Sequence, residues 1–140
     1  MDEEFIRGKE SILLIDDEEM IIEVGRQMLK MLGYTVFIAN SGKEAIGVYQ
    51  KQRNHIDIII LDMVMPDLGG KAVYEKLKKI NPDVKVLLSS GYGMDGQVAD
   101  ILNCGCDGFI QKPFNLKGLS LKVREVLDRK PSDGDLPRFQ

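Results

Sequence analysis

Five short apolar runs, separated by amphipathic stretches, constrain the fold of this chain more than any other feature. The runs are Ser11–Ile15, Tyr34–Ile38, Ile56–Leu61, Val84–Leu88 and Gly108–Ile110. Apolar runs without alternation, such as SILLI and IIIL, are typical of strands that are buried on both faces, as in a parallel sheet. The sequence therefore predicts a parallel five-stranded sheet.

The stretches between and after these runs have helical spacing of apolar residues. They are Glu18–Leu32, a helix that begins after Ser41, Gly70–Ile80, Met94–Asn103 and Asn115–Leu127. Ser41 with Glu44 three residues later is a capping-box pattern, and Asn115 is a suitable N-cap. Strand and helix thus alternate five times, and right-handed crossovers place helices on both faces of the sheet in a doubly wound α/β domain.

Length and composition fit one globular domain and exclude several classes of protein. The 140 residues are 44% apolar, and the net charge of -3 offers no basic surface for nucleic acid. No apolar run reaches the roughly 18–20 residues of a membrane span, and the opening MDEEFIRGKE lacks the core of a signal peptide. We expect a cytoplasmic domain over residues 9–128 without membrane contact, and flexible termini at 1–8 and 129–140.

The cysteines and the single histidine are poor candidates for chemistry. Cys104 and Cys106 are too close for a relaxed disulfide and lack the further ligands of a zinc site, so we expect reduced thiols in a turn. His55 lies in the polar stretch QRNHID before the third strand, and we expect a surface residue. A histidine phosphotransfer protein is excluded, because it would carry its histidine on an all-helical bundle.

The chemistry is predicted where the strands end. In an open parallel sheet, ligands bind outside the carboxyl ends of the strands. The residues that follow the first, third, fourth and fifth strands are Asp16-Asp17-Glu18-Glu19, Asp62, Ser89-Ser90-Gly91 and Lys112-Pro113, in that order. These residues come from four separate strands but are expected to meet at one edge of the sheet.

Their chemistry indicates phosphoryl transfer to a carboxylate. A nucleotide-binding loop would have glycines where this chain has four acids, and acids tolerate a phosphate only with a hard cation such as Mg²⁺ (or Mn²⁺) between them. Aspartate is an established phosphoryl nucleophile, and a lysine can neutralise the transferred group, which suits Asp62 and Lys112. Glu18 and Glu19 are explained by the dipole of the helix that they begin. Ser89 and Ser90 offer hydroxyl donors, or else form a turn.

Four segments at the strand ends resemble the signatures of a known family. ILLIDDEE, IIILDMVMPDLGG, VLLSSGYG and DGFIQKPF occur in that order, and together they resemble the response-regulator receiver domain of two-component phosphorelays over Lys9–Asp128. The resemblance implies a flavodoxin-like fold with strand order 2-1-3-4-5. It also implies that Asp62 accepts a phosphoryl group from a phosphohistidine of a histidine kinase or histidine phosphotransfer domain.

The resemblance further implies roles for individual residues. Asp17, Asp62 and the backbone carbonyl of Val64 would bind the metal directly, while Asp16 would act mainly through metal-bound water. Lys112 would contact Asp62 or its phosphoryl oxygens, and the bond between Lys112 and Pro113 is expected to be cis.

The resemblance also implies roles for four positions in the switch and in the lifetime of the phosphoryl group. Ser90 fits the switch hydroxyl better than Ser89, because a small residue, Gly91, follows it, and Phe109 matches the switch aromatic. The positions that tune dephosphorylation hold Val64 and Tyr92, neither of which has an acid or amide to position a water. We therefore expect a long-lived phosphoryl-aspartate.

Two other function classes fit the sequence less well than the signalling receiver. A haloacid-dehalogenase-type phosphatase would need a second aspartate where Val64 stands, and a degenerate binding module would lack one of Asp17, Asp62 or Lys112. The family's usual contact surface is the fourth helix, fifth strand and fifth helix, here about Met94 to Leu127, and a homodimer could form through it. The run SSGYG…GFIQKPFN also resembles receivers attached to hybrid sensor histidine kinases. We expect a phosphoacceptor rather than an enzyme acting on other substrates.

Overall fold

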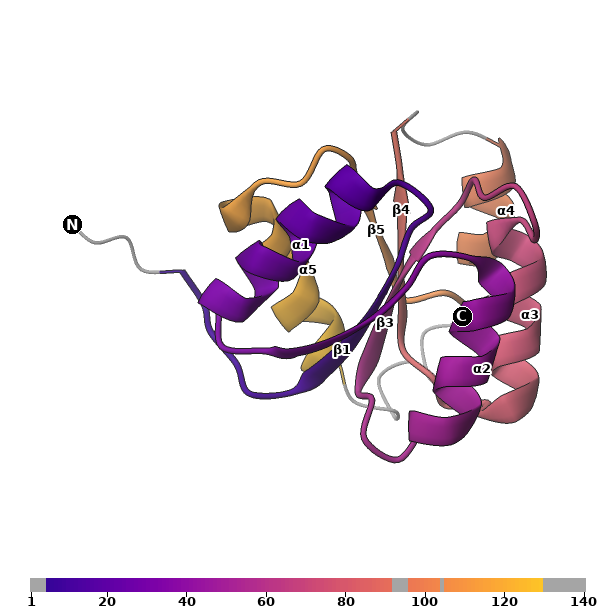
Figure 1. Ribbon diagram of the computed structural model, residues 1–140, viewed down its shortest axis with the longest axis horizontal. Coiled ribbons are helices and arrows are strands. Elements are labelled where there is room, and N and C mark those ends of the chain that lie inside the picture. Colours follow the sequence, from indigo (N-terminus) through magenta and orange to yellow (C-terminus); the bar gives the residue numbers. More distant parts are fainter. Residues whose placement is uncertain (1–4, 92–95, 104, 130–140) are drawn as a thin grey trace.

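The computed structural model describes residues 5–91, 96–103 and 105–129, along which strands and helices alternate (Figure 1). The strands are β1 (Ser11–Ile15), β2 (Thr35–Ala39), β3 (Ile58–Asp62), β4 (Val86–Ser90) and β5 (Gly108–Gln111). The helices are α1 (Glu19–Met31), α2 (Gly42–Gln52), α3 (Gly70–Ile80), α4 (Gly96–Asn103) and α5 (Leu116–Leu127).

The five strands form one parallel sheet in the order β2-β1-β3-β4-β5. This order confirms the predicted doubly wound α/β fold. The chain turns back between β1 and β3, and such a switch point opens a crevice at the carboxyl ends of the two strands. Both strands end there in an aspartate, because Asp16 follows β1 and Asp62 is the last residue of β3.

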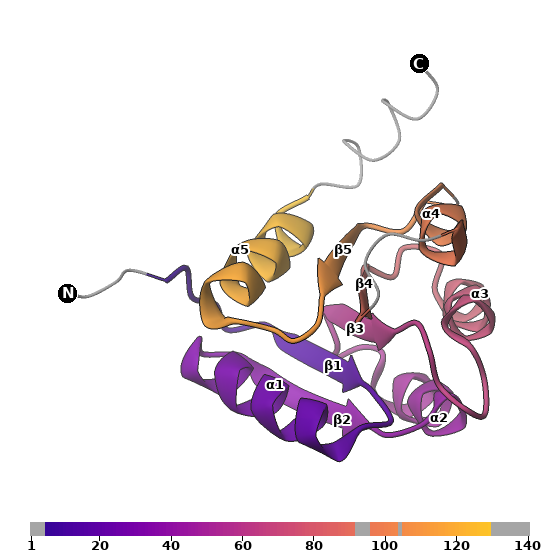
Figure 2. The same ribbon diagram turned by 90° about the horizontal axis from the view of Figure 1, so that it is seen from above.

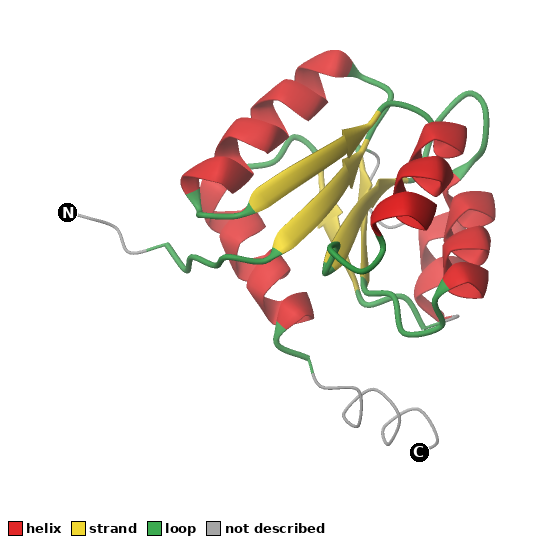
Figure 3. Cartoon of the chain, turned by 60° about the horizontal axis from the view of Figure 1, so that its bottom comes forward, coloured by secondary structure: helices red, strands yellow, loops and turns green. Residues whose placement is uncertain are grey.

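Helices cover both faces of the sheet. Helices α1 and α5 lie on one face, and α2, α3 and α4 lie on the other (Figures 2 and 3). Side chains alternate along each strand, so Ile60 and Leu87 join the core beneath α1 and α5, while Leu61 and Leu88 join the opposite core. Burial on both faces explains why β3 is apolar up to its last residue and β4 over its first three residues.

The predicted helix caps are present. The Ser41 hydroxyl accepts a hydrogen bond from the Glu44 amide at 3.1 Å, and the Glu44 side chain accepts one from the Asn40 amide at 2.7 Å. Asn115 caps α5 by accepting from the Gly118 amide at 2.7 Å. After α1 the chain turns at Gly33, whose φ of 103° lies in the left-handed region that favours glycine.

The predicted ends of several strands were wrong. Strands β3 and β4 run to Asp62 and Ser90, whereas the apolar runs predicted ends at Leu61 and Leu88. The polar residues stay in the strands because their backbone groups are still paired: the Met63 amide donates to the Ser89 carbonyl at 3.0 Å. Ser89 and Ser90 are therefore strand residues rather than the turn after the strand.

A cluster that we call the α5 clasp fastens the segment before β1 to α5, and it consists of Glu10, Arg124 and Asp128. The Arg124 guanidinium donates to the two Glu10 carboxylate oxygens at 3.1 and 2.7 Å and to Asp128 at 2.8 Å. The hydrogen bond from Arg124 is the largest cause that lowers the pKa of Glu10, to about 2. Residues more than a hundred positions apart are thereby joined.

The structure also describes His55 and one of the two cysteines. His55 is exposed, as predicted. The Cys106 thiol is buried and donates to the Val86 carbonyl at 3.1 Å, and burial raises its pKa to about 12, so it remains a protonated thiol. Cys104 lies outside the described residues. None of the helices within the described ranges is long and apolar enough to span a membrane.

Candidate functional site

Two buried carboxylates lie side by side at the carboxyl edge of the sheet. Ile15 of β1 is in register with Leu61 of β3, so Asp16 and Asp62, one position further along, are neighbours. Each residue is only 1% exposed. The strands beneath them are apolar and packed from both sides, which fixes where the carboxylates stand.

Lys112 follows the edge strand β5 and contacts both carboxylates. Its Nζ donates to Asp16 Oδ2 at 2.9 Å and to Asp62 Oδ1 at 3.1 Å. The side chain is 11% exposed, so this is a largely buried ion-paired triad. The bond between Lys112 and Pro113 is cis. Lys112 directly follows β5, and its ammonium group reaches residues at the ends of β1 and β3.

The surroundings of Asp62 favour the protonated form of its carboxyl group. Burial, followed by repulsion from Asp16, raises the pKa of Asp62 to about 6, although Lys112 opposes the change. Burial alone would lower the pKa of Lys112, but its contacts with Asp16 and Asp62 outweigh burial and raise it. At neutral pH Lys112 is therefore cationic and Asp62 is mostly an ionised, poorly solvated carboxylate.

The acids can hold a divalent cation. One oxygen each of Asp16, Asp17 and Asp62 lie within 4.8 Å of one another, and Asp17 is exposed while the other two are buried. The second oxygen of Asp62, Oδ2, is buried and has no hydrogen-bond partner among the described residues. A set of carboxylate oxygens with an unused buried acceptor suits Mg²⁺, which prefers oxygen ligands and retains waters on its open side.

The loop between β3 and α3 is held beside the carboxylates. The Val64 amide points to Asp62 Oδ1, at 3.4 Å. Further along the loop, Asp67 accepts from the amides of Gly42 and Lys43 at 3.0 Å each, at the N-terminus of α2. These amide hydrogen bonds lower the pKa of Asp67. The loop is thus tied to α2, which fixes the segment that carries the Val64 carbonyl.

Asp67 was not assigned a role from sequence. The signal available was the combination Pro66-Asp67 ahead of two glycines, which indicates a turn. That pattern does not indicate that Asp67 accepts hydrogen bonds from the helix that begins 25 residues earlier in the chain.

A cleft of about 460 Å³ opens over the carboxylates. Acidic, apolar and cationic residues share its lining: Asp17, Glu18, Ile21, Asp62, Val64, Gly91, Lys112 and Pro113. The cleft can therefore admit a charged group as large as a phosphoryl group. Val64 at its rim is 58% exposed and would be covered by any protein that seals the opening.

The remaining predicted residues lie around this site. Ser90 is buried at the end of β4, and its backbone carbonyl accepts from the Lys112 amide at 2.9 Å. Phe109 of β5 is partly buried and packs against the core beneath α2, α3 and α4. Tyr92 lies outside the described residues. The roles predicted for Ser90, Phe109 and Tyr92 in switching and dephosphorylation remain predictions.

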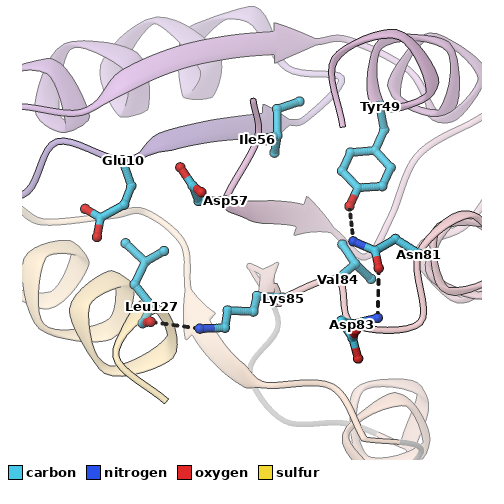
Figure 4. Close-up of a pocket in the computed structure, with 9 residues that line it drawn as sticks. All are labelled: Glu10, Tyr49, Ile56, Asp57, Asn81, Asp83, Val84, Lys85 and Leu127. Carbon is cyan, nitrogen blue, oxygen red and sulfur yellow. Dashed lines mark hydrogen bonds between the residues drawn. The ribbon is translucent and has the colours of Figure 1, made fainter. Parts of the chain in front are cut away.

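A second hollow, of about 290 Å³, lies at the opposite ends of the strands, next to residues that precede β1, β3 and β4 (Figure 4). Polar side chains that line this hollow form hydrogen bonds with other groups of the protein. Asn81 donates to the Tyr49 hydroxyl at 3.0 Å, and Lys85 donates to the Leu127 carbonyl at 2.8 Å (Figure 4). These bonds tie loops to helices, far from Asp62.

Comparison with known proteins identifies the family of the chain. A family model of the response regulator receiver domain matches residues 12–124. The chain is a receiver domain of this family. It therefore belongs to the signalling domains of two-component systems, whose members interact with histidine kinases or phosphotransfer partners.

Relatives show the same domain in different settings. The chain is 35% identical over 124 residues to "Sensor kinase CckA" of Brucella abortus, covering 89% of this chain and 13% of that protein. It is 35% identical over 132 residues to "Probable transcriptional regulator ycf27" of Porphyridium aerugineum, covering 92% of this chain and 54% of that protein. The receiver thus spans only a part of each of these relatives.

Solved structures agree with the fold. A response regulator receiver domain protein from Clostridium thermocellum superposes with a TM-score of 0.81 at 30% identity, covering 86% of this chain and 95% of that one. The receiver domain from the hybrid histidine kinase CckA superposes with a TM-score of 0.71 at 28% identity, covering 84% and 99%.

Proposed function

We propose that Asp62 of this receiver accepts a phosphoryl group from a phosphohistidine of a histidine kinase or histidine phosphotransfer domain. The observation that carries the proposal is the buried triad, in which a desolvated carboxylate at the end of β3 shares Lys112 with Asp16. An Asp62 oxygen forms the new bond to phosphorus as the bond from phosphorus to the histidine nitrogen breaks, and the histidine takes up a proton.

Each residue of the site has a separate role in the proposed transfer. Asp16, Asp17, Asp62 and the Val64 carbonyl would hold Mg²⁺ or Mn²⁺, which when bound supplies positive charge for the phosphoryl oxygens. Lys112 is already within hydrogen-bond distance of Asp62 and can turn toward a transferred oxygen. The tether from Asp67 to α2 keeps the Val64 segment in place while this happens.

The phosphorylated site then signals through Ser90 and Phe109. In the proposed switch, the Ser90 hydroxyl moves toward the phosphoryl group and the Phe109 ring turns inward, which changes the surface of α4, β5 and α5. That surface is where we place the downstream partner or a second copy of the chain. The domain catalyses only its own phosphorylation and dephosphorylation, and we place it in the cytoplasm without contact with nucleic acid or membrane.

A small phosphodonor such as phosphoramidate tests the acceptor. Intact mass should increase by one phosphoryl group in the presence of Mg²⁺ and should not change with EDTA. Asp62→Asn should abolish the increase, whereas Asp57→Asn, an exposed aspartate before β3, should leave it unchanged. Phosphorylation of the Asp62→Asn variant at the wild-type rate would disprove the assignment.

The lifetime of the phosphoryl group tests the proposed role of Val64. An asparagine at this position would give the cleft an amide that can position an attacking water. Val64→Asn should therefore accelerate loss of phosphate, measured by intact mass after removal of the donor. Equal rates in wild type and variant would contradict the proposed apolar protection.

Parent proteins of two kinds are compatible with the domain. The similarity to a sensor kinase supports a receiver that belongs to a hybrid histidine kinase, while the similarity to transcriptional regulators supports a separate regulator. We favour the hybrid kinase, because the SSGYG and GFIQKPFN segments resemble such receivers. Transfer assays with purified kinase and phosphotransfer domains would distinguish the two by the preferred donor.

A further inference from the structure

Ser89 carries a buried hydroxyl with no hydrogen-bond partner among the described residues. The residue is 1% exposed. A buried polar atom without a partner is costly and rare in folded proteins, so each one calls for an explanation. A strand that contributes to two apolar cores would be better served here by an aliphatic side chain.

The position of Ser89 in the sheet places it beside the acceptor. Ser89 is in register with Asp62 of β3 on one side and with Ile110 of β5 on the other. Register partners in adjacent strands point to the same face, and the strands lie about 4.8 Å apart. Asp16, Asp62, Ser89 and Ile110 therefore form one row across four strands, on the face covered by α1 and α5.

The acceptor has an unmatched atom in the same row. Asp62 Oδ1 accepts from Lys112 and lies 3.4 Å from the Val64 amide, whereas Oδ2 is buried without a partner among the described residues. A carboxylate oxygen accepts hydrogen bonds and a serine hydroxyl can donate one by rotating. Ser89 and Asp62 are thus neighbours in the sheet, and each has a buried side-chain oxygen without a partner among the described residues.

Phosphoryl transfer needs one oxygen of Asp62 to face the cleft, which this residue lines. Because the residue is only 1% exposed, we place its second oxygen on the inner side, among the buried residues of the row. Ser89, the register partner of Asp62 on β4, can offer a hydroxyl to that oxygen. A bound cation would occupy only part of the acceptor capacity of this oxygen, so a hydroxyl donor would still lower the cost of burying its charge.

We propose that Ser89 is a positioning residue for Asp62: its hydroxyl donates to the inward oxygen when the other oxygen faces the cleft. This inference rests on the proposed function, since it presumes that Asp62 is the acceptor. Ser89 is distinct from Ser90, the proposed switch hydroxyl, because neighbouring residues of a strand point to opposite faces of the sheet.

Threonine and valine at position 89 provide a matched test, because they differ only in a hydroxyl against a methyl group. With phosphoramidate and Mg²⁺, the maximal phosphorylation rate of Ser89→Val should be about tenfold below that of Ser89→Thr. The donor concentration at half-maximal rate should be equal in the two variants, because the hydroxyl orients Asp62 and does not bind donor. Equal maximal rates would overturn the proposal.

Ser89→Ala guards against crowding by the larger side chains. It should phosphorylate about tenfold more slowly than wild type and unfold at an equal or higher urea concentration, because it loses an unpaired buried hydroxyl. A purely structural role predicts the reverse, with lower stability and an unchanged rate, and that result would also overturn the proposal.

Failure of the underlying function would look different. If the wild-type protein gains no phosphoryl group, or gains it in the Asp62→Asn variant, the acceptor assignment fails and the Ser89 proposal falls with it. If the wild-type protein is phosphorylated at Asp62 and the position-89 variants keep its rate, only the Ser89 proposal fails.

Discussion

Replacing Asp62 by asparagine should make the metal-free protein more stable. The pKa of Asp62 rises from its ordinary value of 3.8 to about 6, mainly through burial and then through repulsion by Asp16. At about 1.36 kcal/mol per pKa unit, ionised Asp62 lowers the free energy of unfolding by about 3 kcal/mol. An asparagine side chain has the same shape as the aspartate and no charge to desolvate, so Asp62→Asn recovers up to this amount.

The sign of the pH dependence follows from proton binding. Between pH 3.8 and about 6 the folded protein holds a proton on Asp62 that the unfolded chain has lost, so stability falls as the pH rises through this window. The gap between variant and wild type should therefore be near its full size at pH 8, should be largely lost near pH 4 and should vanish below that pH.

Urea unfolding followed by circular dichroism in EDTA measures this gap. Asp17→Asn removes the same charge from an exposed position in the same site, and it should change stability by less than about 1 kcal/mol. Added Mg²⁺ should stabilise wild type more than Asp62→Asn, because binding to the folded carboxylates shifts the equilibrium. If Asp62→Asn is no more stable than wild type at pH 8 with an unchanged denaturant slope, the desolvation argument is wrong.

Three further predictions concern the scaffold and the rim of the cleft. Gly70→Ala should lower the free energy of unfolding by about 2 kcal/mol, since its Cβ would lie 2.8 Å from backbone, whereas Gly47→Ala has open space in α2 and should raise it by about 0.5 kcal/mol; thermal unfolding compares them. Met20→Glu should slow phosphorylation by a histidine kinase and spare that by phosphoramidate, because Met20 is exposed in the first turn of α1 near the cleft; Met31→Glu, also exposed but at the far end of α1, should affect neither. Glu10→Gln should cost about 1–2 kcal/mol at pH 7, less than its lowered pKa would give without solvent screening; the deficit in urea unfolding should shrink as the pH falls from 4.5 toward 2, and a deficit that persists at pH 2 would contradict the ion pair.

The fold was predictable because its strongest signals are local. The run before Asp62 is apolar without interruption, and α3 begins and ends at the predicted Gly70 and Ile80. The carboxyl ends of β3 and β4 were misplaced for a physical reason. A polar residue normally marks the end of a buried strand, but Asp62 and Ser89 remain buried because groups from other strands and a lysine 50 residues away surround them.

The site was predictable to the extent that strand order determines it. Asp16, Asp62 and Lys112 lie at the carboxyl ends of three strands of one parallel sheet, so the alternation of strands and helices was enough to bring them to one edge. The tie from Asp67 to α2 was not predictable, because it depends on how a loop lies against a helix of another unit. The unpaired Ser89 hydroxyl was likewise invisible, since only the packing around it reveals that it has no partner among the described residues.

Stability and reactivity at Asp62 have a common origin. The packing that desolvates its carboxylate makes the ionised form costly, and the hydrogen bond from Lys112 keeps that form populated at neutral pH. Full neutralisation would remove the nucleophile, and full solvation would remove the gain from transferring its charge to a phosphoryl group that Lys112 and a bound cation can reach. A substitution that relieves the folded protein of a cost in this row should therefore lower the phosphorylation rate: Asp62→Asn removes the desolvated charge, and Ser89→Ala removes the unpaired buried hydroxyl.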